Sequence, residues 1–304
     1  MELWHDRILV LDFGSQYTQL IARRIREAQV YSQILPCTVP LATVLAYRPK
    51  GIVLSGGPSS VYDKKAPSVS KQLFEQGIPI LGICYGMQLV THLQGGEVEK
   101  APHREFGRAE LTLDDRSDLF KGIGTRGSTV VWMSHGDRIE RMPPGFRSIA
   151  HTDNSPIAAM KRHDARQRIY CLQFHPEVAH TTEGATILKN FVYDICGCKP
   201  TWTMRSYVDT AVEQIRQQVG TERVICALSG GVDSSVAAAL THRAVGDQLT
   251  CIFVDNGVLR TGERDQVEKT FASQMHLNMR ILDRTSQFLT GLKSVTDPER
   301  KRKI

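Results

Sequence analysis

The chain has 304 residues, of which 41% are hydrophobic and 23% are charged, and this ordinary globular composition excludes a collagen, a coiled coil and a wholly disordered chain. The 38 basic and 32 acidic residues give a net charge of +6, too mild an excess to predict a nucleic-acid partner, since such proteins usually concentrate basic residues on one face. No apolar run approaches the roughly 20 residues that span a bilayer, and the N-terminus shows no signal-peptide pattern, so we expect no membrane partner. The 7 cysteines are scattered and odd in number, which favours reduced thiols in a cytoplasmic protein.

Short apolar runs alternate with longer amphipathic runs along the chain, a pattern typical of α/β architecture. In chain order, the first elements expected are a strand at 7–11, a helix at 16–27, strands at 51–54 and 78–83, a helix at 85–93, strands at 130–133 and 169–174, and a helix at 184–196. We therefore predict one doubly wound α/β domain over residues 1–199.

The periodicity breaks after this block, and we interpret residues 200–206 as a linker. The next elements expected are a helix at 207–219, a strand at 224–228, a helix at 233–244, and strands at 250–255 and 279–282. They predict a second doubly wound α/β domain over residues 207–304. We expect this domain to be truncated, because a parallel sheet needs several strands with both faces covered.

The first motif that indicates chemistry lies at the end of the expected strand 78–83. There an apolar run meets Gly82, Cys84 and Gly86 in the pattern G-x-C-x-G, and a helix follows, as in a nucleophile elbow with Cys in place of Ser. The glycines let the chain turn tightly, and the helix N-terminus favours a thiolate. The amide of Tyr85 would point where an oxyanion forms. Taken alone, the motif is also compatible with a small buried cysteine before a glycine turn.

Two further segments support a nucleophile at Cys84. His175 and Glu177 follow an apolar strand, and residues i and i+2 of an extended segment project to the same side. The imidazole of His175 can therefore act as the base, and the carboxylate of Glu177 can hold that imidazole in orientation. Gly57 follows the strand 51–54 and is our candidate for a second oxyanion donor. Each segment alone has an ordinary structural explanation, as a surface histidine, a helix-start carboxylate or a tight turn.

Residues 6–195 resemble the class I, triad-type glutamine amidotransferases. The markers, in the order of that family, are Gly-Gly-Pro at 56–58, Gly-Ile-Cys-Tyr-Gly-Met-Gln at 82–88 and His-Pro-Glu at 175–177. The resemblance implies that Cys84 attacks the carboxamide of glutamine, that ammonia leaves, and that water hydrolyses the thioester to glutamate. His175 and Glu177 would complete the triad.

The same resemblance implies a binding site for the amino-acid end of glutamine. Gln88, one helical turn beyond Cys84, would touch this end of the substrate, and Asp137 would bind its α-amino group. Ser134 belongs to the same segment, although some relatives carry Asn there. His135 occupies no triad position, and we interpret it as structural.

A second motif follows the expected strand 224–228 and precedes a helix. It consists of Ser229, Gly230, Gly231, Val232, Asp233, Ser234 and Ser235. A strand, a glycine loop and a helix N-terminus together form an anion cradle of backbone N–H groups, although Ser and Asp also make ordinary N-cap turns. No G-K-[ST] follows, so this is not a Walker A loop.

This loop resembles the PP-loop of the N-type ATP pyrophosphatases, which have an adenine-nucleotide hydrolase-like fold. The resemblance implies that the seven loop residues bind the phosphates of ATP and that Asp233 faces Mg²⁺. It also places Asp255, at the end of the next strand, near the adenosine, although Asp255 is also compatible with a turn.

A triad-type glutaminase joined to an N-type pyrophosphatase resembles the bacterial-type, glutamine-hydrolysing GMP synthetases. That resemblance implies glutamine, ATP and XMP as ligands: ATP adenylylates XMP, and ammonia then displaces AMP to give GMP. It implies a homodimer when the chain is full length, and we expect residues 1–304 alone to hydrolyse glutamine at most. The alternatives are another ATP-coupled glutamine amidotransferase, or a non-catalytic regulatory module on this fold.

Overall fold

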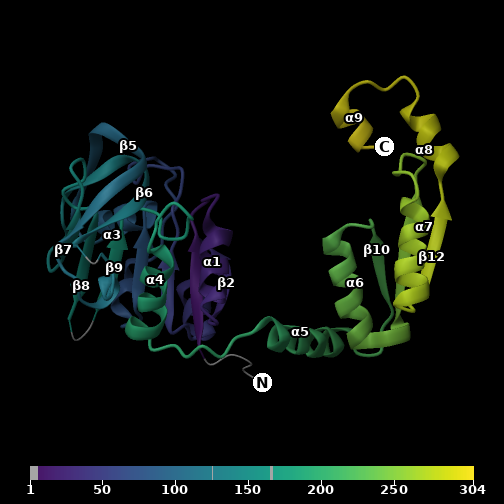
Figure 1. Ribbon diagram of the computed structural model, residues 1–304, viewed down its shortest axis with the longest axis horizontal. Coiled ribbons are helices and arrows are strands. Elements are labelled where there is room, and N and C mark those ends of the chain that lie inside the picture. Colours follow the sequence, from purple (N-terminus) through teal and green to yellow (C-terminus); the bar gives the residue numbers. More distant parts are fainter. Residues whose placement is uncertain (1–5, 125, 165–166) are drawn as a thin grey trace. The chain divides into compact units, whose positions relative to one another are not determined.

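The computed structural model describes residues 6–124, 126–164 and 167–304. The chain forms two compact units, Met1–Thr203 and Met204–Ile304, and each contains its own sheet (Figure 1). The α/β class predicted for both parts is therefore confirmed. The predicted boundaries, with a linker at 200–206, remain a prediction.

The first unit contains a nine-stranded sheet in the order β2-β1-β3-β4-β9-β8-β7-β5-β6. Its parallel half consists of β2 (Tyr31–Pro36), β1 (Arg7–Asp12), β3 (Gly51–Leu54), β4 (Ile80–Ile83) and β9 (Arg168–Leu172). Every residue of β3 and β4 is buried, as expected for strands of a parallel sheet that is covered on both faces.

The other half of this sheet is antiparallel. It consists of β8 (Ala159–His163), β7 (Arg147–His151) and a long hairpin of β5 (Glu97–Leu113) and β6 (Ser128–Arg141). From this region the sequence pattern predicted only a short strand at 130–133. The rest was missed because buried and partly buried positions alternate along β6, so polar residues interrupt the apolar runs by which a strand is predicted.

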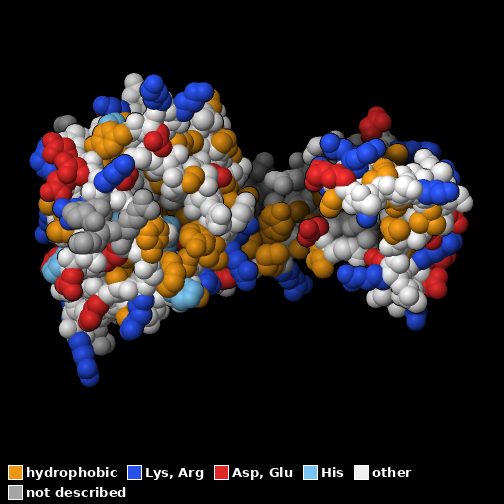
Figure 2. Space-filling view, turned by 90° about the horizontal axis from the view of Figure 1, so that it is seen from above, with side chains coloured by type: hydrophobic (Ala, Val, Ile, Leu, Met, Phe, Trp, Pro, Cys, Tyr) orange, Lys and Arg blue, Asp and Glu red, His pale blue; other side chains and the backbone are white. Residues whose placement is uncertain are grey.

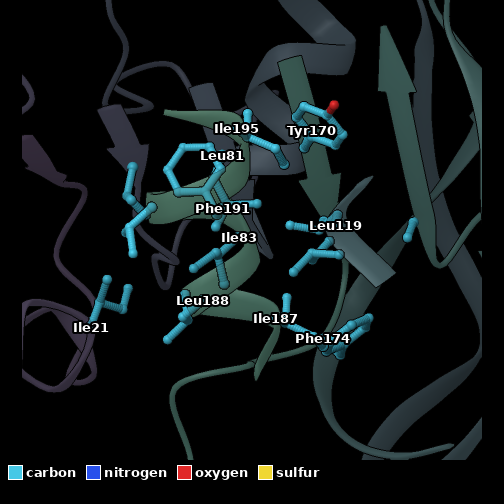
Figure 3. Packing of buried hydrophobic residues seen from close by; sticks show 14 of the residues in the cluster. Ile21, Leu81, Ile83, Leu119, Tyr170, Phe174, Ile187, Leu188, Phe191 and Ile195 are labelled. Carbon is cyan, nitrogen blue, oxygen red and sulfur yellow. The ribbon is translucent and has the colours of Figure 1, made fainter. Parts of the chain in front are cut away.

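Helices cover both faces of the parallel half. One face carries α1 (Thr18–Glu27), α4 (Gly184–Lys189), the π-helical turn Asn190–Ile195 and the 3₁₀ turn Asp118–Phe120; the other carries α2 (Leu41–Tyr47), the 3₁₀ turn Lys71–Glu75 and α3 (Tyr85–Leu93). Successive side chains of a strand face opposite sides, so Leu81 and Ile83 pack with Ile21, Ile187 and Phe191 on the first face (Figure 3). The helix predicted at 184–196 is thus an α-helix that continues as a π-helical turn.

The second unit has a parallel sheet in the order β10-β11-β12. Its elements are α5 (Met204–Val219), β10 (Val224–Leu228), α6 (Val232–Val245), the 3₁₀ turn Gly246–Gln248, β11 (Leu249–Asp255), α7 (Glu263–Val267), the π-helical turn Glu268–Gln274, β12 (Met279–Asp283), α8 (Thr285–Leu292) and α9 (Pro298–Arg302). A small core around Phe253 and Phe271 holds the unit together, while Ile225 of β10 is 72% exposed.

The surface of both units is mixed in charge. On the face shown in Figure 2, Lys and Arg side chains are interspersed with Asp and Glu side chains. That distribution is typical of a solvated protein surface. Among the described residues, no helix combines the length and the apolar character that crossing a membrane requires.

We expect Gly86→Ala to destabilise the first unit by roughly 2 kcal/mol or more, because a Cβ on Gly86 would run into the Leu54 carbonyl oxygen and lie 2.8 Å from the Leu54 Cβ. Alanine is intrinsically the better helix residue, so any loss of stability must come from this clash. Thermal unfolding measures it. The control is Gly291→Ala in α8, where only the end of the Ile304 side chain comes close, and a Gly86→Ala chain as stable as the original would contradict the packing described.

Candidate active site

Cys84 occupies a strained turn between β4 and α3. Its backbone has φ 50° and ψ −105°, a conformation that non-glycine residues rarely adopt. The turn is fixed by a hydrogen bond from the Cys84 N–H to the Leu172 carbonyl of β9 at 2.7 Å. A Cβ on Gly82 would lie 2.9 Å from the backbone of Gly86, so both flanking glycines are required for the turn to close. The predicted elbow is present.

Three adjacent parallel strands end at the same edge of the sheet and bring the predicted residues together. β3 is followed by Gly56, β4 by Cys84, and β9 by the segment with His175. A Cβ on Gly56 would lie 3.2 Å from Cε1 of His175 and 3.7 Å from Cβ of Cys84. The backbone at Gly56 therefore lies against both residues.

The imidazole of His175 lies between a carboxylate and the thiol. Its Nδ1 is 2.7 Å from Oε1 of Glu177, and both side chains are buried. Burial alone lowers the pKa of His175, but hydrogen bonds to Cys84 and Glu177 and the charges of both outweigh burial and raise that pKa to about 10. These partners favour the protonated form of the ring.

Several residues that the sequence analysis did not single out hold these groups in place. The hydroxyl of Thr181 donates to the His175 carbonyl at 2.6 Å, and Arg24 donates to the Glu177 carbonyl at 3.0 Å. The fully buried Gln173 places its Nε2 3.9 Å from the Cys84 sulfur. Residues 173, 175 and 177 alternate along one extended segment and so share a face, and this spacing could have identified Gln173. No sequence pattern points to Thr181 or Arg24.

The two predicted oxyanion donors are neighbours. Tyr85 is the first residue of α3, so its N–H is one of the first-turn donors that have no acceptor inside the helix. Gly57 packs against it, since a Cβ there would lie 3.3 Å from Cγ of Tyr85 and 2.8 Å from the Phe13 carbonyl oxygen. The Tyr85 side chain points away and donates to the Pro67 carbonyl.

A cavity of about 380 Å³ opens beside the sulfur and is lined by both Cys84 and Gly57. All three residues predicted to bind the amino-acid end of glutamine line it, namely Gln88, Ser134 and Asp137. The Cys84 sulfur is 3.6 Å from the Ser134 carbonyl, and Gln88 donates to the Asp137 carbonyl at 3.1 Å. The Asp137 carboxylate accepts from Ser60 at 2.9 Å.

In the second unit, the loop between β10 and α6 is held by its own hydroxyl groups. The hydroxyls of Ser234 and Ser235 both donate to the Gly231 carbonyl, at 3.1 Å and 2.6 Å, and the Ser229 N–H donates to the Ser234 hydroxyl at 3.2 Å. Gly230 has φ +76°, which favours glycine. Val232 opens α6 and Asp233 follows in its first turn, exposed to solvent.

A cavity of about 640 Å³ adjoins this loop. Gly230 and Ser235 of the loop line it together with Arg260 and Glu263. Asp255 is held in its own turn instead, where its carboxylate accepts from the Gly257 N–H at 3.0 Å and from Arg264 at 3.4 Å. The structure thus brings the loop residues together. The side chain of Asp255 is engaged in a local turn, which is the alternative to a nucleotide contact that the sequence left open.

The described residues of both units contain no group of three or more His, Cys, Asp or Glu side chains that would hold a metal by themselves. Mg²⁺ usually takes one or two carboxylates and completes its shell with water and substrate phosphates. The exposed carboxylate of Asp233, beside a loop rich in N–H and hydroxyl groups, fits that mode of binding.

Comparison with known proteins decides the family. The sequence model of the class-I glutamine amidotransferases matches residues 9–195, and that of NAD synthase matches residues 204–299. The chain belongs to the class-I glutamine amidotransferases. Its second unit is similar to the NAD synthase family, as the predicted PP-loop implies.

Similar proteins extend over both units. The GMP synthase [glutamine-hydrolyzing] of Carboxydothermus hydrogenoformans is 53% identical over 98% of this chain, and that of Geobacillus kaustophilus is 54% identical over 98%. The chain spans 58% of the length of each of these relatives. A solved structure from Thermoplasma acidophilum, named for a GMP synthase subunit, is similar to the first unit with TM-score 0.53 and 29% identity, covering 63% of this chain and 94% of its own.

We expect the raised pKa of His175 in this amidotransferase to make stability depend on pH. The pKa of a histidine is about 6.5 in an unfolded chain and about 10 here, so folding takes up a proton between these values. The stability that His175 adds relative to His175→Gln is fully present below pH about 6.5 and declines as pH rises towards 10.

The measurement is urea unfolding of both chains at pH about 6, below the range where this histidine takes up its proton, and at pH about 8 and 9.5, within that range. His151→Gln, which removes a half-exposed ring on β7, is the control. A difference in unfolding free energy that stays the same at all three pH values would show that His175 is not an imidazolium.

Proposed function

We propose that this chain hydrolyses glutamine at Cys84 and supplies the ammonia to an ATP-dependent synthesis of GMP from XMP. The observation that carries the glutaminase part is the 2.7 Å contact of the buried His175 with Glu177 next to the strained turn of Cys84, with the Gly56 backbone against both His175 and Cys84. This is the arrangement of a nucleophile, a base and a group that orients the base.

The first half of the reaction forms a thioester. The Cys84 sulfur attacks the carboxamide carbon of glutamine, and the negative charge that develops on oxygen is stabilised by the N–H groups of Tyr85 and Gly57. His175 then gives its proton to the leaving nitrogen, so that ammonia departs and a glutamyl thioester remains. Glu177 keeps the ring oriented throughout.

The second half regenerates the thiolate. The neutral His175 takes a proton from water, and the resulting hydroxide attacks the thioester carbon. Glutamate leaves, and the sulfur and the imidazolium are restored as a pair. Gln88, Ser134 and Asp137 line the cavity next to the sulfur and would hold the amino-acid end of the substrate, with the Asp137 carboxylate on the α-amino group.

In the second unit, the loop from Ser229 to Ser235 would bind the phosphates of ATP through backbone N–H groups, hydroxyls and the N-terminus of α6. Mg²⁺, when bound at Asp233, would neutralise the phosphate charge during adenylyl transfer. ATP would adenylylate the C2 oxygen of XMP and release pyrophosphate, and ammonia would then displace AMP to give GMP. XMP as acceptor, the role of Asp255 and a homodimer of the longer protein remain predictions.

A second candidate is a different amide ligase that couples glutaminase to ATP, and the match of residues 204–299 to NAD synthase favours it. The similarity to GMP synthases over both units supports the first proposal more strongly. Trials of a chain extended to the length of these relatives, with XMP and other acceptors in turn, separate the two. AMP release that depends on XMP alone supports GMP synthesis.

We expect Cys84→Ala to abolish glutamate formation from glutamine, and His175→Ala to lower its rate by about 100-fold or more, because the general acid and base is lost. Glutamate release and covalent labelling by a glutamine-mimicking electrophile measure both effects. The control is Cys37→Ala, which removes another buried free thiol. Equal labelling of the original chain and of His175→Ala would favour a non-catalytic module.

We expect Mg²⁺ to strengthen the binding of pyrophosphate to the second unit through Asp233. In Asp233→Asn this gain should fall by roughly tenfold, since the charge facing the metal is lost while the loop N–H groups remain. Calorimetric titration of pyrophosphate with and without Mg²⁺ measures the gain. Asp247→Asn, an exposed change in the 3₁₀ turn after α6, is the control, and an unchanged gain in Asp233→Asn would contradict the assignment.

A further inference from the structure

A second buried pair of a histidine and a carboxylate lies at the wall of the cavity beside Cys84. Glu105 of β5 and His135 of β6 are opposite each other in the hairpin, and their side chains are only 9% and 1% exposed. Nε2 of His135 is 3.2 Å from Oε2 of Glu105. Neither residue belongs to the triad, and burying two ionisable side chains is costly unless they are paired.

Glu105 is a carboxylate that only accepts hydrogen bonds. Thr152 donates to its Oε1 at 3.0 Å, and Ser155 donates to its Oε2 at 2.8 Å. Burial raises the pKa of Glu105, but the hydrogen bonds from His135, Ser155 and Thr152 outweigh burial and bring that pKa below its ordinary value. The group is therefore ionised, and its oxygens are occupied by three donors.

The orientation of the His135 ring is fixed by its two partners. Nδ1 lies 3.0 Å from the Asp137 carbonyl oxygen, and Nε2 lies next to the Glu105 carboxylate. Each ring nitrogen therefore has a partner on a different segment, and the buried ring links Glu105 of β5 to the backbone at Asp137 of β6.

This ring fixes the segment that forms one wall of the cavity. The Asp137 carbonyl accepts from both the His135 ring and the Gln88 amide. Ser134, His135 and the cross-strand neighbour of Ser134, Phe106, all line the cavity, and the His135 side chain is buried in its wall. The regular pairing of β5 with β6 is interrupted between Lys100 and Glu105, and Glu105–His135 is the first regular pair after the interruption.

We propose that Glu105 and His135 are positioning residues that hold the Ser134–Asp137 segment in the geometry that receives the amino-acid end of glutamine. This inference rests on the proposed glutaminase function. The pair acts through the Asp137 backbone and does not touch the reacting carboxamide. Its loss therefore weakens substrate binding, while the nucleophile and its base remain intact.

The test compares two reagents for Cys84 in the original chain, Glu105→Gln and His135→Gln. The glutamine analogue diazo-oxo-norleucine carries an amino-acid end, whereas iodoacetamide does not. We expect the variants to react about tenfold or more slowly with the analogue and within about twofold of the original rate with iodoacetamide. In glutamine hydrolysis, KM should rise by about tenfold while kcat changes by less than about threefold.

Three companion measurements complete the design. Thr152→Val removes one of the three donors to Glu105 and should give an intermediate loss of reaction with the analogue, which keeps the test decisive if a Glu105 or His135 variant fails to fold. The control is His151→Gln on the neighbouring strand β7, where the ring of His151 pairs with Asp114. This change should leave the rates of reaction with both reagents unchanged. Circular dichroism confirms that each variant is folded.

The outcomes separate the two claims. If the variants lose reaction with both reagents equally, or keep both, the positioning role is wrong, although the glutaminase proposal stands. If the original chain reacts with iodoacetamide but not with the glutamine analogue, the proposed function is wrong and the inference falls with it. A selective loss of the analogue reaction supports the inference.

Discussion

The buried contact of His175 with Glu177 and Cys84 is the interaction on which the first site depends. Three ionisable groups removed from water are stable only when they are paired, so the strands that carry them cannot shift independently. β4 and β9 are hydrogen-bonded neighbours with Ile83 opposite Leu172, and the Cys84 N–H adds a further bond to the Leu172 carbonyl. A slip of one residue would turn His175 and Glu177 together to the opposite face, away from Cys84.

Close packing of backbone imposes a second constraint on this site. Gly82 and Gly86 approach each other across the elbow, and Gly57 lies against the Phe13 carbonyl, so any side chain at these positions would displace a neighbouring strand or helix. These glycines are therefore needed because neighbouring segments of backbone lie close to them, more than because the chain must be flexible there. The turn at Cys84 could be predicted because the need for glycine beside it is local and leaves a visible pattern in the sequence.

What could not be predicted depends on pairings between distant segments. The parallel strands were predicted because each is a continuous apolar run, but the hairpin of β5 and β6 alternates and pairs out of register near Lys100. Without that register, nothing in the sequence places Glu105 opposite His135, and His135 was interpreted as merely structural. Asp255 shows the reverse case: its local turn chemistry and a nucleotide role were both compatible with the sequence, and its side chain is engaged in the turn.

The two sites differ in how far they are prepared for their ligands. Around Cys84 the His175 ring, the Glu177 carboxylate and the first-turn N–H of Tyr85 are already in place for the proposed reaction, so little reorganisation would be needed to stabilise developing charge. In the loop of the second unit, by contrast, the hydroxyls of Ser234 and Ser235 donate to the Gly231 carbonyl. A bound phosphate would compete for those donors, so binding there must exchange hydrogen bonds within the loop for hydrogen bonds to the ligand. If this loop binds ATP as proposed, binding would therefore include a local rearrangement that the site at Cys84 would not need.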